Sequence, residues 1–78
     1  MRIPNYRTEA NYETAKINSK NYAASLRYCD VNAKASVVNG RPCVEIKSVP
    51  KWVAKSILED CMNHKTSAFY CDVFIETV

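Results

Sequence analysis

The sequence predicts one α+β domain over residues 1–78, a four-stranded, mostly antiparallel sheet with a helix packed on one face. Three observations support this fold class: an Asn-Gly turn between two alternating segments, an amphipathic helical stripe after them, and a further alternating segment near residue 78. A strand over residues 22–29 and an N-terminal helix over residues 8–20 complete the expected architecture.

A β-hairpin over residues 33–47 is the clearest local signal. Its turn is Asn-Gly at residues 39–40, which contains the only glycine of the chain, and a type I′ turn needs positive φ at both positions. The register sets Lys34 opposite Glu45, whereas a one-residue slip would bury both charges. The expected pairs are Val38 with Arg41, Val37 with Pro42, Ser36 with Cys43, Ala35 with Val44, Lys34 with Glu45 and Ala33 with Ile46.

The stretch before the hairpin is predicted as the first strand of a three-stranded antiparallel meander. Residues 22–29 alternate between two faces, and residues 30–32 supply turn residues. Farther upstream, Thr8 is a suitable N-cap for the helix over residues 8–20, although asparagines weaken its helical propensity. A strand through residues 13–18 stays open as the alternative for this part.

A helix over about residues 49–64 follows the hairpin, with Ser48 as the expected N-cap and Pro50 in the first turn. Its apolar positions form one broad stripe, which we expect to cover the apolar face of the sheet. These positions are Val53, Ala54, Ile57, Leu58, Cys61 and Met62.

The last predicted strand covers residues 67–78, with Phe69, Cys71, Val73 and Ile75 facing the helix. A helix of about 15 residues returns the chain by roughly 22 Å, so this strand is expected to run parallel to the second hairpin strand. Because Pro42 has no N–H, that hairpin strand is expected at the sheet edge. The last strand is then placed beside residues 22–29.

Composition is typical of a globular protein, with 47% hydrophobic residues and a mild net charge of +3. No apolar run approaches the roughly 18 residues of a membrane span, and no signal peptide is visible, so a cytoplasmic location is expected. In that compartment the cysteines are expected to be free thiols, with disulfides or a metal site as the other options. The four are Cys29, Cys43, Cys61 and Cys71.

Catalytic motifs are missing from the sequence. It has one histidine and lacks a glycine-rich phosphate loop, an HExxH motif and a nucleophile elbow. Cys61 and His64 form one close pair of metal ligands, whereas zinc needs four ligands. We therefore expect no catalytic residue, cofactor or metal, and a function through binding.

Two groups of residues are candidates for binding a partner. Trp52, with Lys51 and Lys55 beside it, lies opposite the apolar stripe; it either bends back to complete the core or serves as an exposed anchor. On the sheet face turned away from the helix, Tyr70 and Phe74 suggest a contact surface, unless the face is only solvated or the N-terminal segment covers it. Arg27, Lys34 and Arg41 are the basic candidates on that face.

The segment Lys51-Trp52-Val53-Ala54-Lys55, after a three-stranded meander, resembles the last helix of double-stranded RNA-binding domains. That family has the order α-β-β-β-α, and the resemblance implies phosphate contacts for Lys51 and Lys55. It covers about half of the chain. The family's Gly-Pro-x-His loop is absent from this sequence, and the C-terminal strand is additional.

Chain size and the lack of catalytic motifs resemble the small inhibitors encoded by phages and mobile elements, including anti-CRISPR proteins. We therefore expect a cytoplasmic protein-binding module that blocks a site on a larger protein or ribonucleoprotein, with no membrane partner. A nucleic-acid-binding module, similar to double-stranded RNA-binding domains or related to transcription, is the alternative. A homodimer through the edge near Pro42 or through the aromatic face is a third option.

Overall fold

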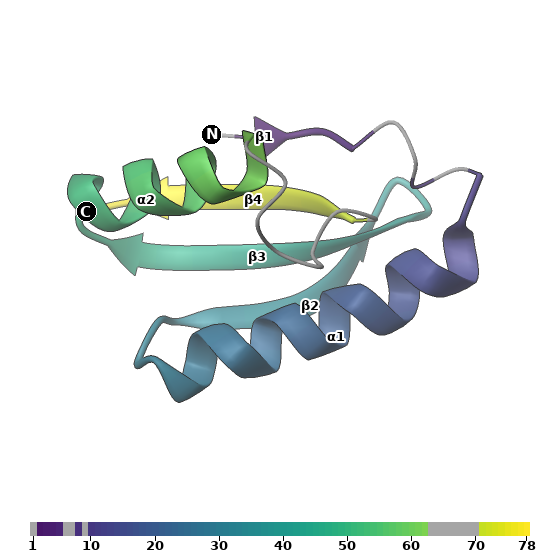
Figure 1. The fold of residues 1–78 in the computed structure, drawn as a ribbon, viewed down its shortest axis with the longest axis horizontal. Coiled ribbons are helices and arrows are strands. Elements are labelled where there is room, and N and C mark those ends of the chain that lie inside the picture. Colours follow the sequence, from purple (N-terminus) through teal and green to yellow (C-terminus); the bar gives the residue numbers. More distant parts are fainter. Residues whose placement is uncertain (1, 6–7, 9, 63–70) are drawn as a thin grey trace.

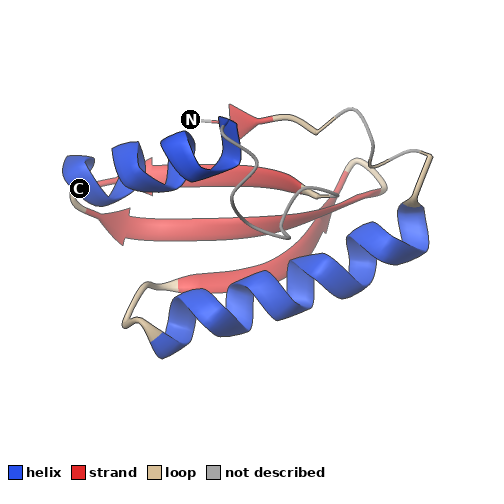
Figure 2. Cartoon of the chain, viewed as in Figure 1, coloured by secondary structure: helices blue, strands red, loops and turns tan. Residues whose placement is uncertain are grey.

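The computed structural model describes residues 2–5, 8, 10–62 and 71–78 (Figure 1). The elements in chain order are β1 (Arg2–Ile3), α1 (Tyr12–Tyr28), β2 (Ala33–Val38), β3 (Arg41–Val49), α2 (Lys51–Met62) and β4 (Asp72–Thr77). The strands form one sheet in the order β1-β4-β3-β2, with β3 and β4 parallel and the other neighbours antiparallel. The predicted α+β fold is therefore confirmed (Figure 2).

The hairpin of β2 and β3 has the predicted register at every pair, from Val38 with Arg41 to Ala33 with Ile46. Its turn has φ of 53° at Asn39 and 75° at Gly40. Positive φ at both central positions is what a type I′ turn requires, and a glycine adopts it without steric cost. The local sequence thus specifies this element.

The predicted strand over residues 22–29 is wrong, because residues 22–28 continue α1. Helical spacing places Ala15, Ser19 and Ala23 on one buried face of α1. Residues 22–29 contain no β-branched side chain, and alanine and leucine favour a helix. Residues 22–29 do alternate, but Tyr22, Ala23 and Leu26 also have helical spacing and contact the core from one side of α1.

The end of α1 is a Schellman motif. Asp30 has φ of 61°, its N–H donates to the Arg27 carbonyl at 3.0 Å, and the Val31 N–H donates to the Leu26 carbonyl at 2.9 Å. These two bonds satisfy carbonyls that the helix would otherwise leave unpaired, and they turn the chain into β2.

β3 is an interior strand, which corrects the prediction that it forms the sheet edge. β4 runs parallel to β3, as predicted, but it lies directly beside β3 and not beside residues 22–29. Pro42 does not prevent this arrangement, because the parallel pairing begins one residue later, at Cys43 with Asp72. The outer edge of the hairpin is therefore β2.

The start of α2 also differs from the prediction. Ser48 lies within β3 with φ of 59°, in the irregular stretch of the β3–β4 pairing between Ile46 and Val49. It is therefore not the N-cap. The Pro50 carbonyl accepts the Ala54 N–H at 3.1 Å instead, so the helix begins immediately after the proline.

Both helices pack on one face of the sheet and share one core with it. The predicted cover by α2 is confirmed, since Ala54 and Ile57 are buried; the side chain of Met62 lies outside the described part. Val73 and Ile75 of β4 face this core as expected, while Phe69 lies outside the described residues. Neither helix that the structure describes is long and apolar enough to span a membrane.

Candidate functional site

Trp52 lies on the first turn of α2 with 74% of its surface exposed. The interpretation in which it bends back into the core is therefore wrong. The buried residues Ala54 and Ile57 hold the opposite side of α2 against the sheet, and at 100° per residue this directs position 52 outward. The first turn of α2 thus presents a large aromatic side chain to solvent.

Lys51, Lys55, Ser56 and Glu59 are exposed and surround Trp52 on the outer side of α2. Neither lysine forms an ion pair with any residue that the structure describes. We call Lys51, Trp52, Lys55, Ser56 and Glu59 the Trp52 surface. It combines an exposed aromatic side chain with two lysines that form no ion pair within the described part of the chain.

The open face of the sheet, which both helices leave uncovered, contains one row of register neighbours across all four strands. From β2 to β1 the row is Lys34, Glu45, Phe74 and Arg2. Lys34 Nζ lies 3.5 Å from a Glu45 carboxylate oxygen, and the Arg2 guanidinium carbon lies 5.6 Å from the centre of the Phe74 ring. Each charge of this row is therefore already engaged within the chain.

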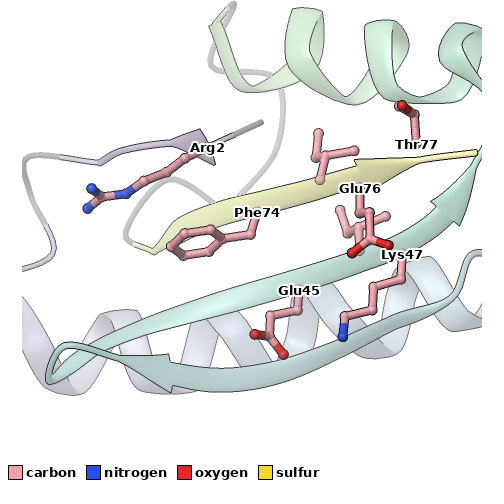
Figure 3. Close-up of a pocket in the computed structure, with 8 residues that line it drawn as sticks. Arg2, Glu45, Lys47, Phe74, Glu76 and Thr77 are labelled. Atoms are coloured by element: carbon pink, nitrogen blue, oxygen red, sulfur yellow. The ribbon is translucent and has the colours of Figure 1, made fainter.

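A shallow hollow includes Glu45, Phe74 and Arg2 of this row in its lining (Figure 3). Its charged lining residues are two acids and two bases, and the ring of Phe74 is also part of the lining. The lining consists of Arg2, Glu45, Ile46, Lys47, Phe74, Ile75, Glu76 and Thr77. Such mixed charges do not select one sign of ligand.

The N-terminal segment covers the other end of the open face. Asp72, only 1% exposed, accepts a hydrogen bond from the Asn5 N–H at 2.8 Å and contacts Thr8 Oγ1 at 3.5 Å. Arg41 Nε and Arg2 Nη2 donate to Asp72 Oδ2 at 2.9 and 3.2 Å. Burial alone would raise the pKa of Asp72, but the hydrogen bonds from Arg41, Asn5 and Arg2 outweigh it and lower that pKa.

Cysteine chemistry is suppressed in the interior. Burial raises the pKa of the Cys71 thiol to about 12 and also raises the pKa of Cys43 and of Cys61, whose thiol shares a hydrogen bond with the Tyr22 hydroxyl. A thiol that stays protonated is a poor nucleophile and metal ligand. All four cysteines are free thiols, and Cys29 is exposed. His64, which the sequence pairs with Cys61 as a possible metal ligand, lies outside the described residues.

The structure brings together only some of the predicted binding residues. Trp52, Lys51 and Lys55 share the outer side of α2, whereas Lys34 and Phe74 lie on the open face of the sheet. The prediction that Arg27 lies on the open face is wrong, because residues 22–28 are helical. Arg27 belongs to α1, where its guanidinium donates to the Ala33 carbonyl at 2.9 Å. The remaining two are Arg41, bound to Asp72, and Tyr70, which lies outside the described residues.

Sequence reasoning did not identify two further features. Tyr28 is 92% exposed at the end of α1, and helical periodicity over residues 12–28 would have placed it opposite Ala23 and Leu26. Asp72 was only one polar residue among several on the open face, and no local pattern relates it to Arg2 or Arg41, which lie 70 and 31 residues away. Comparison of the chain with protein-family models, with curated proteins and with solved structures found no match.

Proposed function

We propose that this chain is a non-enzymatic protein-binding module and that it docks through the Trp52 surface. The observation that carries the proposal is the 74% exposure of Trp52. Covering three quarters of a tryptophan side chain of about 200 Å² removes roughly 150 Å² from water, which is worth about 4 kcal/mol before the costs of association. One residue of this kind, at the centre of an interface, is typical of a binding hot spot.

The partner that fits this surface has an apolar pocket with an acidic rim. Lys51 and Lys55 have no ion-pair partner among the described residues, so a carboxylate on the partner gains a Coulomb interaction without breaking one in this chain. The open face of the sheet is the weaker candidate, because Arg2 already lies over Phe74 and Lys34 is paired with Glu45.

As a biological class we propose a cytoplasmic inhibitor of the kind that phages and mobile elements encode, anti-CRISPR proteins included, which blocks a site on a larger protein or ribonucleoprotein. The support for this class is the small α+β domain and the lack of catalytic motifs in the sequence. An exposed tryptophan anchor on a small domain suits a protein that acts by occupying a site.

The test uses a photo-crosslinking residue, benzoylphenylalanine, placed at position 52 or at position 28, in cells of the host. We expect a discrete crosslinked protein from position 52 and none from position 28, because Tyr28, although even more exposed than Trp52, lies outside the Trp52 surface. Binding of the identified protein should weaken at least tenfold with Trp52→Ala and remain unchanged with Tyr28→Ala. Equal loss with both variants, or no crosslink from position 52, would contradict the proposal.

A nucleic-acid-binding module is the second candidate. One observation favours it: Lys51 and Lys55 flank an exposed aromatic ring on which a base could stack. The element order differs from that of double-stranded RNA-binding domains, since two strands, β2 and β3, and not three lie between α1 and α2. Arg41, Lys34 and Arg27 also lie away from α2 and are already bonded within the chain.

Fluorescence anisotropy with labelled duplex RNA, duplex DNA and single strands separates the two candidates. Binding that falls steeply between about 50 and 200 mM salt, and that is lost on Lys51→Glu with Lys55→Glu, would favour nucleic acid over protein. No binding at the lower salt concentration would exclude the second candidate.

A further inference from the structure

The two edges of the sheet are protected to very different degrees. Proteins shield edge strands by making them short, by proline, by bulges or by charges, because unpaired backbone groups can accept another strand. β1, on one edge, has two residues. β2, on the other edge, has six residues without proline or a register shift, and its only charge, Lys34, is paired with Glu45.

The register shows which backbone groups of β2 point outward. In an antiparallel pair, hydrogen-bonded and non-hydrogen-bonded positions alternate, starting from the bonded pair that closes a two-residue turn, here Val38 with Arg41. Val37 is therefore a non-bonded position, which agrees with its partner Pro42, whose nitrogen carries no hydrogen. The N–H and C=O groups of Ala33, Ala35 and Val37 face away from β3.

One of these outward groups is already used. The Ala33 carbonyl accepts the hydrogen bond from Arg27 at 2.9 Å, which independently shows that this position faces outward. No hydrogen bond among the described residues reaches the outward groups of Ala35 or Val37. Ala35 and Val37 thus offer two donors and two acceptors on alternate residues, while Ala33 keeps only its N–H.

We propose that two copies of the chain pair through β2, antiparallel, about a twofold axis at Ser36. In this register Ala35 lies opposite the partner's Val37 and Val37 lies opposite the partner's Ala35. Each pair exchanges two hydrogen bonds, so the four bonds use every outward group of Ala35 and Val37 in both copies. Two four-stranded sheets become one continuous eight-stranded sheet.

The neighbouring registers fail for reasons visible in the structure. An axis at Ala35 would place Ala33 opposite the partner's Val37 and would need the Ala33 carbonyl, which Arg27 holds. An axis at Val37 would use Asn39, whose φ of 53° takes it out of the extended conformation. The chain therefore specifies one register.

Side chains are compatible with the Ser36 register. Val37, 56% exposed in the single chain, packs against the partner's Ala35, which is small enough to admit it. Lys34 lies opposite the partner's Val38, so like charges do not face each other across the axis. This second copy is a better occupant than an unrelated strand, because the edge is complementary to itself.

The first test is the molar mass in solution by sedimentation velocity, from about 10 µM to about 1 mM protein. We expect the mass of two chains at the upper end. Val37→Pro removes the outward N–H of Val37 without removing a hydrogen bond of the hairpin, and should return the mass of one chain. Val37→Thr keeps both the N–H and the branched side chain, and should still form the dimer.

The second test does not depend on a variant. Amide hydrogen exchange at Ala35 and Val37 should slow by roughly tenfold or more between the dilute and the concentrated sample, whereas Ser36, bonded within the hairpin, should change little. A one-chain mass at the highest concentration with unprotected Ala35 and Val37 amides would overturn the proposal. So would a dimer that folded Val37→Pro still forms.

Discussion

Replacing Asp72 by asparagine is the sharpest test of how the N-terminal segment is held. The side chain keeps its size but loses its charge, so the guanidinium groups of Arg41 and Arg2 no longer face a carboxylate at 2.9 and 3.2 Å. One carboxylate oxygen of Asp72 also receives the Asn5 N–H at 2.8 Å. The substitution therefore weakens the junction that Arg2, Asn5 and Thr8 make with the sheet.

The expected cost is large for a domain of this size. Removing one partner of a buried ion pair typically costs about 3–5 kcal/mol, and we take about 3 kcal/mol because the side chains of Arg41 and Arg2 remain 20% and 50% exposed and can rehydrate. A chain of this length has a free energy of unfolding of roughly 4–12 kcal/mol. Asp72→Asn should therefore lower Tm by about 15 °C.

Urea unfolding followed by far-UV circular dichroism measures the expected loss of about 3 kcal/mol in the free energy of unfolding. Glu45→Gln is the matched control, because it removes a carboxylate from the same sheet face but breaks only the more exposed pair with Lys34 at 3.5 Å. That control should cost at most about 1 kcal/mol. If Asp72→Asn costs no more than Glu45→Gln, the Asp72 cluster does not anchor the N-terminal segment as we infer.

Three further predictions concern pH, fluorescence and thiols. The folded-state pKa of Asp72 lies below its ordinary value of 3.8, so its contribution to stability is complete above pH 3.8 and is lost as the pH falls through the lower, folded-state value. The free energy of unfolding should therefore fall less steeply with acid in Asp72→Asn, and an unchanged slope would contradict this. Trp52, the only tryptophan, should emit almost as it does in the unfolded chain and be readily quenched by acrylamide; a blue-shifted, protected emission would contradict its exposure. A thiol reagent should modify Cys29 quickly in the folded protein, and buried Cys43 and Cys71 only on unfolding; equal rates would contradict the described burial.

The sequence alone determined the elements in which turn residues and apolar spacing indicate the same local structure. The hairpin was predictable in full because the Asn-Gly turn at residues 39–40 fixes the register, and a slip would bury charge. The helix of α2 and the inward side of β4 were predictable because their apolar spacing fits only one regular structure. Trp52 was identified from the helical wheel as the residue opposite the core.

Tertiary structure decided whatever depends on two distant segments. The pattern of residues 22–28 is compatible with a strand and with a helix that has Tyr22, Ala23 and Leu26 on one side. The packing of α1 against β2 and β3 decided for the helix. The position of β4 beside β3, and with it the free edge at β2, depends on which strands meet and not on the pattern within either strand.

The site residues divide in the same way. The sequence by itself determined that Trp52 lies opposite the apolar stripe of its helix, but only the fold decided that no other segment the structure describes covers it. The sequence predicted Arg41 as a basic residue of the open face that binds a partner, whereas the fold brought it to Asp72, 31 residues away. The physical reason is that periodicity reports which side of an element is apolar, while pairing between distant charges and edges follows from the topology that joins them.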